Sequence, residues 1–580
     1  MTMEHPTTPK HVFPIDRFLH AGEARLTAGL SPSSALSAYL DWAAHLANSP
    51  GKIGELFEKA FRKSLKFNAH VGEALLEKEG TPCIEPLAQD NRFRGEDWRR
   101  PPYIFYYQAF LLLQQWWHNA TTSVEGVSDH HQDVVAFCAR QFLDVFAPSN
   151  FLLTNPEALK ITLESGGMNL VRGAQNFFED WARAALQKPP LGTENFRVGK
   201  DVAITPGKVV YRNNLIEVIQ YAPSGKTVHP EPVLIVPAWI MKYYILDLSP
   251  HNSLVKYLVD GGHTVFMISW KNPHEEDRNL GMDDYIDGGV TAALAAVRAI
   301  VPEEKVHAVG YCIGGTLLSI AAAALGRDGE DRLKSMTLFA AQTDFTEAGE
   351  LMLFIDQSQI AYLEDLMWDK GYLDTKQMTG AFQMLRSNDL IWSRIVHEYL
   401  LGNRRAMIDL MAWNADATRM PYRMHSEYLR KLFLKNAFAE GHYYVGDKPA
   451  TPSDIRVPIF AVGAEKDHVA PWKSVYKINF FADVEVTFLL TSGGHNAGII
   501  SPPDHPRRHH RIATKPGCDP YISPEDWIET TEEHPGSWWP AWQAWLVKHS
   551  GARRKPPAMG KAEAGYPPLC DAPGTYVLME

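Results

Sequence analysis

Gly310-Tyr311-Cys312-Ile313-Gly314-Gly315 is the stretch that decides the fold of this chain. It follows an apolar run, Lys305 to Val309, that predicts a short strand. It precedes Thr316 to Leu325, an alanine- and leucine-rich run that predicts a helix. Glycines two residues before and two after the cysteine allow a turn that is too tight for any Cβ. The turn lifts the cysteine above a sheet, where the backbone N–H of Ile313 can face a developing oxyanion.

This strand–turn–helix predicts the nucleophile elbow of an α/β-hydrolase fold, with cysteine where serine usually stands. A thiol forms a thioester when it is acylated, and the acyl group stays reactive enough to pass to a hydroxyl. An enzyme that only hydrolyses esters gains little from this chemistry. An enzyme that accepts acyl groups from coenzyme A and passes them on gains a great deal.

Composition narrows the class of protein. A length of 580 residues predicts two domains or one large decorated domain, and a net charge of −11 argues against nucleic acid as a partner. The N-terminal residues lack the basic and apolar segments of a signal peptide, and the apolar run from Tyr103 to Trp117 is too short to span a bilayer. Five cysteines are scattered without paired spacing: Cys83, Cys138, Cys312, Cys518 and Cys570. We therefore expect a cytoplasmic protein with no disulfide framework, metal site or cofactor.

The pattern of the chain changes near residue 190. Residues 1–190 predict a mainly helical N-terminal domain, with a capped helix beginning near Ser31 and further helices at Tyr103–Trp117 and Gly173–Leu186. After a Pro-Gly break, residues 191–580 alternate short strands with helices, which predicts a mostly parallel sheet covered on both faces. The expected strands are a hairpin at Val209–Ile219 and runs at Pro232–Val236, Thr264–Ser269, Val306–Val309, Met336–Ala340, Val457–Val462 and Val484–Leu490.

One interval breaks this alternation. Residues 341–454 are largely helical and rich in aromatic residues and methionine. They follow the strand after the nucleophile helix, where a cap over the active site would be inserted. The alternative is a surface subdomain that only adds core. The segment after Gly551 has Lys-Pro and Ala-Gly clusters and is expected to be poorly ordered.

The other catalytic residues follow from chain order, which in this fold is nucleophile, acid and then histidine. The predicted strand Val457–Val462 leads into Ala464-Glu465-Lys466-Asp467-His468, so Asp467 is the expected acid and Glu465 its rival. The next predicted strand leads into a glycine-rich loop that carries His495. His495 would take the thiol proton, and Asp467 would hold the histidine tautomer.

Further candidates are less specific. The second oxyanion donor is expected from the loop after the strand at Pro232–Val236, at the backbone N–H of Ile240 or Trp239. Substrate contacts are predicted for Trp239, for His468 and for Arg386, although a loop histidine is more often structural and a helix arginine more often solvated. The basic run from His505 to Arg511 could bind a metal ion or phosphate, but a solvated loop is favoured, and no metal site is predicted.

Taken together, these residues closely resemble the polyhydroxyalkanoate synthases. The resemblance runs from the N-terminal domain nearly to the end of the chain and rests on several strings. These include residues 148–158 (PSNFLLTNPEA), 164–167 (ESGG), 242–248 (KYYILDL), 269–273 (SWKNP), 413–418 (WNADAT), 467–472 (DHVAPW), 494–498 (GHNAG) and 534–540 (HPGSWWP). The residues that flank Cys312 and the full-length N-terminal domain are similar to those of the class I members.

The resemblance implies a poly-3-hydroxybutyrate polymerase that acts on short (R)-3-hydroxyacyl-CoA, with Cys312, Asp467 and His495 as catalytic residues. It further implies a homodimer, a growing polyester chain as partner, and association with the surface of polyester granules. It also implies that Asp467, as well as His495, could activate the substrate hydroxyl. One departure stands out, because the loop after Pro237 commonly reads Cys-Ile-Asn-Lys in the family and here reads Ala238-Trp239-Ile240-Met241-Lys242. The acyl-chain preference is therefore left open.

Two rival functions remain. A cysteine hydrolase of esters or lactones would use the same fold, but it would not need the large N-terminal domain. A non-catalytic granule scaffold would keep the elbow as a relic, but the full set of cysteine, aspartate and histidine in the expected order argues against it.

Overall fold

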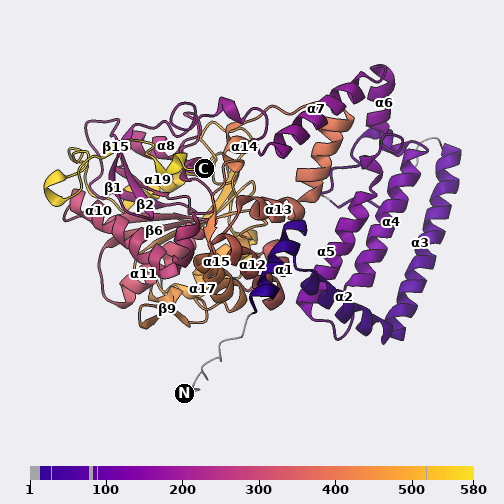
Figure 1. Ribbon diagram of the computed structural model, residues 1–580, viewed down its shortest axis with the longest axis horizontal. Coiled ribbons are helices and arrows are strands. Elements are labelled where there is room, and N and C mark those ends of the chain that lie inside the picture. Colours follow the sequence, from indigo (N-terminus) through magenta and orange to yellow (C-terminus); the bar gives the residue numbers. More distant parts are fainter. Residues whose placement is uncertain (1–12, 28, 78–81, 88, 518) are drawn as a thin grey trace. The chain divides into compact units, whose positions relative to one another are not determined.

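A large sheet organises the catalytic part of the chain in this computed structural model, which describes residues 13–27, 29–77, 82–87, 89–517 and 519–580. In the described part, eleven strands form one sheet in the order β14-β13-β12-β11-β6-β5-β3-β4-β2-β1-β15 (Figure 1). From one edge to the other the strands are β14 (Glu533–Pro535), β13 (His509–Lys515), β12 (Val486–Thr491), β11 (Ile459–Ala464), β6 (Leu333–Phe339), β5 (Val306–Tyr311), β3 (Val233–Val236), β4 (Val265–Trp270), β2 (Ile216–Tyr221), β1 (Gly207–Arg212) and β15 (Cys570–Asp571).

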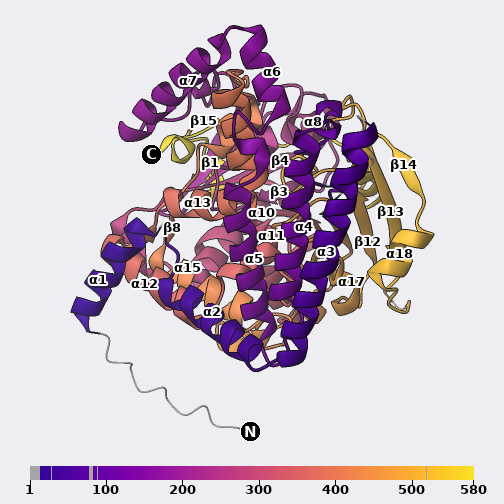
Figure 2. The ribbon, with the colours of Figure 1, turned by 90° about the vertical axis from the view of Figure 1, so that its right-hand side faces the viewer.

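The middle of the sheet is parallel and its edges are antiparallel. Six strands, from β12 to β4 in the sheet order, pair in parallel through the contacts β12–β11, β11–β6, β6–β5, β5–β3 and β3–β4. The β1–β2 hairpin, β13, β14 and β15 add antiparallel strands, and Figure 2 shows β12, β13 and β14 at one edge. Every residue of β5, β11 and β12 is buried, as expected for apolar strands packed on both faces. The predicted mostly parallel sheet is confirmed.

Helices lie on both faces of the central strand β5. A Cβ at Gly310 would approach the Gly315 Cα of α11 (Ile313–Arg327) to 2.3 Å, so the Gly310 side faces α11. His307 points to the opposite face, because the two residues differ by an odd number along the strand. On that face its Nε2 contacts the Ser550 hydroxyl at 3.0 Å, just beyond α19 (Trp539–Lys548). Trp542 of α19 reinforces this layer by donating from Nε1 to the Thr337 hydroxyl at 3.1 Å.

The chain divides into two compact units. Unit 1 contains residues 1–26, 192–377 and 407–580, and unit 2 contains residues 27–191 and 378–406. The chain passes from unit 2 to unit 1 between Leu191 and Gly192, next to the Pro-Gly break seen in the sequence.

Unit 2 is a helical bundle. Its helices are α2 (Pro32–Ala47), α3 (Pro50–Glu77), α4 (Tyr103–Thr121), α5 (Asp129–Val145), α6 (Pro156–Glu164) and α7 (Met168–Ala185). Ser31 caps α2 by accepting from the Ser34 N–H, as its position predicts. Figure 1 shows α3, α4 and α5 side by side, and Ile104, Tyr107 and Phe110 of α4 lie in the core of the unit. The apolar run at Tyr103–Trp117 thus contributes to the packed core of this unit.

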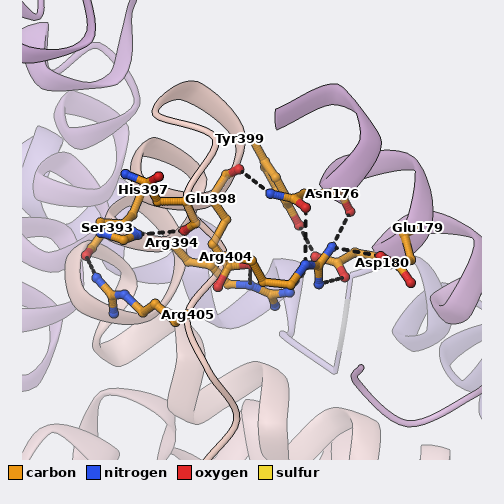
Figure 3. Close-up of polar contacts among 11 residues, drawn as sticks. Asn176, Glu179, Asp180, Ser393, Arg394, His397, Glu398, Tyr399, Arg404 and Arg405 are labelled. Carbon is orange, nitrogen blue, oxygen red and sulfur yellow. Dashed lines mark hydrogen bonds and ion pairs between the residues drawn. The ribbon is translucent and has the colours of Figure 1, made fainter. Parts of the chain in front are cut away.

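Charged and polar side chains bind helix α7 of unit 2 to residues 393–405 of the same unit. Asp180 of α7 binds Arg404 at 2.8 Å, Arg394 at 2.7 Å and the Tyr399 hydroxyl at 2.9 Å (Figure 3). A Cβ at Gly173 would meet the Tyr399 carbonyl oxygen at 1.8 Å, so the helix backbone approaches this segment closely. Residues 393–405, far along the chain, therefore pack directly on α7.

The insertion between β6 and β11 is largely helical, as predicted. Its helices include α12 (Gln357–Lys370), α13 (Thr375–Leu385), α14 (Asp409–Asn414) and α15 (Tyr422–Tyr428). Residues 378–406 of it belong to unit 2, and the remainder belongs to unit 1. The N-terminal helix α1 (Pro14–Leu26) packs on α12, where Arg17 and His20 both reach Asp365, at 3.4 and 2.8 Å.

Two expectations from sequence are wrong. The segment after Gly551 is ordered, because β15 pairs with β1 and the buried Glu217 carboxylate accepts the N–H groups of Thr575 and Tyr576 at 2.9 and 3.0 Å. The basic run ending at Arg511 is a loop only in part, because β13 begins at His509 and pairs with β12 and β14. The partner of β15 is distant in sequence, whereas β13 pairs with the strands that precede and follow it along the chain. Cys518 and the N-terminal residues Met1 to Pro6 lie outside the described residues.

Candidate active site

Cys312 stands on a strained turn between β5 and α11. Its φ of 54° and ψ of −131° lie outside the regions that side chains ordinarily adopt. Gly314 and Gly315 make the turn possible, since a Cβ at Gly314 would lie 2.4 Å from the Pro237 carbonyl oxygen and one at Gly315 would lie 2.4 Å from the Ala341 Cβ. The thiol is held at the carboxyl end of the sheet, with Cys312 only 7% exposed.

His495 and Asp467 lie together as chain order predicts. Each follows the end of its strand, β12 for His495 and β11 for Asp467, and the two loops are joined by a bond from the Lys466 N–H to the Gly493 carbonyl oxygen at 2.9 Å. The His495 Nδ1 lies 2.7 Å from Asp467 Oδ2. The other carboxylate oxygen, Oδ1, accepts the N–H groups of Val469 and Ala470, each at 2.8 Å. The Asp467 side chain has no exposed surface and cannot turn away from the histidine.

The charges around His495 favour its protonated form. Burial by itself would lower the pKa of His495, but Asp467 and Cys312 act against burial through their charges and through side-chain hydrogen bonds, and they hold that pKa well above 6.5. An imidazolium between a carboxylate and a thiol is the arrangement that activates a cysteine nucleophile. The structure thus brings Cys312, His495 and Asp467 together, with His495 interacting with both of the other side chains.

The rival acid, Glu465, has another partner. Its carboxylate contacts the His509 Nε2 at 3.0 and 3.1 Å, at the start of β13. Because His509 belongs to a strand that was not predicted, the sequence did not reveal this pair. The structure places Asp467, not Glu465, beside His495.

Two backbone N–H groups are available near the elbow. Ile313 is the first residue of α11, where the backbone N–H has no partner within the helix. The loop after β3 lies against the elbow through the Pro237 carbonyl, and Thr418 holds that loop by donating its N–H to the Ile240 carbonyl at 3.3 Å. Among the described residues, the Ile240 N–H donates no hydrogen bond. Within the part of the chain that the structure describes, neither N–H, of Ile313 or of Ile240, donates a hydrogen bond to another backbone group outside the helices and strands.

Aromatic side chains surround the thiol. The ring of Tyr311 stacks on His495 at 5.8 Å, and its hydroxyl donates to Asn496 Oδ1 at 2.6 Å. Tyr428, from α15 in the insertion, lies close enough to Cys312 for a negative charge on the sulfur to raise the pKa of the phenol. Burial first, and then the charge of Cys312, raise the pKa of Tyr311 and of Tyr428 well above 10. Both phenols are therefore neutral.

The predicted substrate contacts differ in position. Trp239 is buried against Trp270, Tyr285 and Tyr428, and its indole N–H has no partner among the described residues. His468 is exposed beside Asp467, and its carbonyl faces Gly349 of the insertion. Arg386 belongs to unit 2 and forms an ion pair with Asp389. Across the ranges that the structure describes, no group of three or more His, Cys, Asp and Glu side chains is placed to hold a metal ion.

Comparison with known proteins agrees with this geometry. Residues 10–52 and 89–258 match two models of the N-terminal part of poly-beta-hydroxybutyrate polymerases, and residues 231–502 match the alpha/beta hydrolase fold. The poly(3-hydroxyalkanoate) polymerase of Methylorubrum extorquens is 40% identical over 543 residues, which cover 91% of this chain and 89% of that protein. The chain belongs to the poly(3-hydroxyalkanoate) polymerase family.

Other polymerases of this family align over similar lengths. The polymerase subunit PhaC of Rhizobium etli is 39% identical over 87% of this chain and 79% of its own length. The polymerase subunit PhaC of Cupriavidus necator is 35% identical over 93% of this chain and 90% of its own length. As a poly(3-hydroxyalkanoate) polymerase the protein is an acyltransferase. No helix in the described ranges combines the length and the apolar character needed to cross a membrane.

Sequence reasoning missed three residues around the polymerase site. Tyr428 approaches Cys312 from the insertion, Lys242 ties the loop after β3 to the last residues of the chain, and the buried Glu217 anchors that last segment. Lys242 lies in the string 242–248 that supports the family resemblance. The string indicated that the residue matters but did not indicate what it contacts. Nothing local in the sequence indicates the partners of Glu217 or of Tyr428.

Proposed function

We propose that this polymerase joins (R)-3-hydroxyacyl groups, with 3-hydroxybutyryl-CoA as the expected substrate, into a polyester through a thioester on Cys312. The observation that carries the proposal is the line of Cys312, His495 and Asp467, with an imidazolium stabilised beside a cysteine. A cysteine suits repeated acyl transfer because its thioester keeps the acyl group reactive toward a hydroxyl.

In the first step, the Cys312 thiolate attacks the thioester carbonyl of the acyl-CoA. The N–H groups of Ile313 and Ile240 stabilise the oxyanion that forms. The carbon–sulfur bond to CoA then breaks, and the CoA sulfur leaves with the proton from the His495 imidazolium. The products are an acylated Cys312, free CoA thiol and a neutral His495.

In the second step, the 3-hydroxyl of a hydroxyacyl group attacks the thioester. Neutral His495 takes the hydroxyl proton, an ester bond forms, and Cys312 leaves as thiolate beside the renewed imidazolium. Two bases are conceivable for this proton, His495 and Asp467. We favour His495, because the Asp467 side chain is unexposed and both of its oxygens already accept hydrogen bonds.

Water has to be excluded, because it would hydrolyse the same thioester. Tyr428, Phe345 and Phe433 of the insertion form one aromatic cluster, with ring contacts of 4.8 to 6.3 Å. Tyr428 in this cluster lies near Cys312, and the thiol is nearly unexposed. We therefore include in the proposal that the insertion is a cap that covers the active site and has to shift before substrate enters.

The test supplies purified protein with (R)-3-hydroxybutyryl-CoA and follows both the released thiol and the fate of the acyl group. Insoluble polyester together with stoichiometric CoA supports the proposal. Free 3-hydroxybutyrate with CoA would instead identify a hydrolase, and no release of thiol would identify a scaffold. The Cys312→Ala variant is the matched control, because it removes the nucleophile and leaves the turn with a small side chain.

A polyester product also requires a surface that stays attached to it. Helix α7 of unit 2 exposes Val171, Phe178 and Trp181 on one face, and the two aromatic side chains are each 63% exposed. A helix face that meets only water seldom exposes several large apolar side chains together. We include granule association through α7 in the proposal, and hence a cytoplasmic protein that is carried on polyester granules.

The granule part is tested by sedimentation with poly(3-hydroxybutyrate) particles. Phe178→Ser combined with Trp181→Ser should weaken binding while CoA release from soluble substrate is retained. Phe480→Ser, at an exposed phenylalanine of unit 1, is the matched control. Equal binding by both proteins would remove α7 from the granule contact. A homodimer, implied by the family resemblance, is checked by sedimentation velocity of the free protein.

A further inference from the structure

We propose that residues 577–579 act through Lys242 to position the loop that carries the second oxyanion donor. Lys242 is then a positioning residue for the transfer reaction, and the last segment of the chain is part of the active-site scaffold. This inference rests on the function proposed above, since it concerns the loop of Ile240.

The Lys242 ammonium is buried and has three oxygen partners. Its Nζ donates to the carbonyl oxygens of Val577 at 2.6 Å and Met579 at 2.8 Å, and it forms an ion pair with Asp416 Oδ1 at 3.2 Å. An ammonium carries three protons, so these acceptors match its donors. A buried lysine with fewer acceptors would pay a large desolvation cost. Two of the three acceptors come from residues 577–579.

That segment is itself firmly anchored to the sheet. The fully buried Glu217 of β2 accepts from the N–H of Thr575 at 2.9 Å and of Tyr576 at 3.0 Å, and the Tyr576 hydroxyl donates to the Asn213 carbonyl at 2.5 Å. Val577 is buried as well. The carbonyls that hold Lys242 therefore have a fixed position relative to the sheet.

Lys242 ends the loop that begins at Pro237. At its first end, the Pro237 carbonyl lies against the elbow glycine Gly314 and accepts from Trp270 Nε1 at 2.9 Å. At its other end, the Lys242 carbonyl accepts from Trp413 Nε1 at 2.7 Å, while the side chain reaches residues 577 and 579. Ile240 lies between these two ends.

Thr418 binds the Ile240 carbonyl directly, and Lys242 fixes the end of the loop that follows, so the direction of the Ile240 N–H depends on both contacts. Oxyanion donors stabilise the transition state more than the bound substrate, so a misdirected donor lowers kcat and leaves KM largely unchanged. A general loss of stability would also lower the apparent kcat at constant KM, because it reduces the amount of active protein, so kcat has to be expressed per folded active site.

The experiment measures kcat and KM for the first CoA released from (R)-3-hydroxybutyryl-CoA. Three chains are compared with wild type: Lys242→Met, a chain ended after Tyr576, and the combination of both. We expect each single change to lower kcat about tenfold or more, with KM within about twofold. Because both changes break the same contact, the combination should lose little more than either one.

Two controls separate this role from general effects. Lys208→Ala removes an exposed lysine that pairs with Asp571 of β15, shortly before residues 577–579, but does not touch the loop, and its kcat should equal that of wild type. A chain ended after Met579 retains both oxygen acceptors, with that of Met579 now in the terminal carboxylate, and should also retain kcat. Thermal unfolding and circular dichroism verify that each variant is folded. If Lys242→Met does not fold, the two shortened chains decide the matter, since only the one ended after Tyr576 should lose kcat.

Three outcomes would overturn the inference. One is a Lys242→Met variant with the kcat of wild type, and another is a combined variant whose losses multiply. The third is equal kcat in the two shortened chains. Failure of the proposed function can be told apart from failure of this inference. It would appear as CoA release by Cys312→Ala, whatever the Lys242 variants do.

Discussion

At the scale of single residues, the site is set by the strained backbone of Cys312 and by the charges that Asp467 and Cys312 place beside His495. The positive φ of Cys312 costs on the order of 1–3 kcal/mol, which the fold sustains because glycines flank the turn and β5 and α11 are buried. The charges of Asp467 and Cys312 outweigh the effect of burial on His495. The proposed role of Cys312 as the nucleophile rests on these two features.

Replacing the nucleophile should abolish transfer without unfolding the protein. Cys312→Ala removes the sulfur that forms the thioester, and Cys312→Ser replaces it with a poorer nucleophile at neutral pH. We expect CoA release by the alanine variant to fall by a factor of about 10⁴ or more, with a trace at most in the serine variant. The measurement is thiol release with circular dichroism as the check on folding. Release within tenfold of wild type would contradict the assignment.

Replacing the acid should act through the histidine. In Asp467→Asn the main charge that raises the pKa of His495 is lost while burial remains, so that pKa should fall, which a histidine NMR titration can follow. If Asp467 acts only by holding His495, the first release of CoA and later elongation should slow by similar factors. His495→Gln should fail already at the first release. An Asp467→Asn variant with a normal first release and no elongation would instead make Asp467 the base for the hydroxyl.

At the scale of elements, the proposal gives the insertion between β6 and β11 control of access to the thiol. Phe345, Tyr428 and Phe433 pack as one aromatic cluster, and α1 fastens α12 through Asp365 and Asp369. Helices held by a few aromatic contacts and partly exposed ion pairs can move as a body at modest cost. Under the proposal, the insertion closes around the thioester and opens for acyl-CoA.

The cap makes a prediction about labelling. In a protein whose other cysteines are replaced by serine, a bulky maleimide should modify Cys312 slowly, and a substrate analogue that opens the cap should accelerate this. Polymerisation should show a lag that shortens as a growing chain favours the open form. A small alkylating reagent is the control for thiol reactivity. Modification by the bulky reagent as fast as that of a free small thiol would show that nothing covers the site.

The contact between α7 and residues 393–405 makes a second prediction. Asp180 binds two arginines and a tyrosine hydroxyl, and its side chain is largely buried. Asp180→Ala would leave Arg394 and Arg404 without their main acceptor, at a cost of about 2 kcal/mol. We expect faster hydrogen exchange in residues 393–405. Glu179→Ala, at a half-exposed neighbour that binds only Arg404, should change exchange little. Equal exchange in both variants would show that the charges do not hold this segment.

At the scale of the whole molecule, buried neutral histidines link stability to pH. Burial lowers the pKa of His263 and of His307 to about 3 and that of His425 to about 4. In the unfolded chain a histidine takes up its proton near pH 6.5. The unfolded state therefore binds more protons below this pH, and stability falls as the pH is lowered from about 6.5 toward 4.

Removing one of these histidines should weaken that dependence. His263→Phe retains a ring against His229 and removes a group whose nitrogens have no partners in the described structure. The loss of stability between pH 7 and pH 5 should shrink by about 2 kcal/mol. The measurement compares denaturant midpoints at the two pH values, and His505→Ala at an exposed loop is the control. An unchanged difference between the two midpoints would show that His263 does not titrate on unfolding.

Much of the catalytic architecture could be predicted because its signals are local. The elbow needs glycines at set distances from Cys312, and each parallel strand is a short apolar run between turns, so both are visible in the sequence. Chain order then led to His495 and to Asp467. The helices at Ser31 and Tyr103 followed from caps and periodicity, and these elements formed as expected.

What only the tertiary structure decided depends on contacts between distant residues. The sequence favoured Asp467 over Glu465, and only the structure showed the partner of Glu465, because β13 brings His509 to it. The segment after Gly551 has a composition typical of a loose tail, yet Glu217 and Lys242 bind it across more than 300 residues of chain. Local pattern cannot reveal such partners, because a buried carboxylate or ammonium is stabilised by whichever backbone groups the fold brings to it.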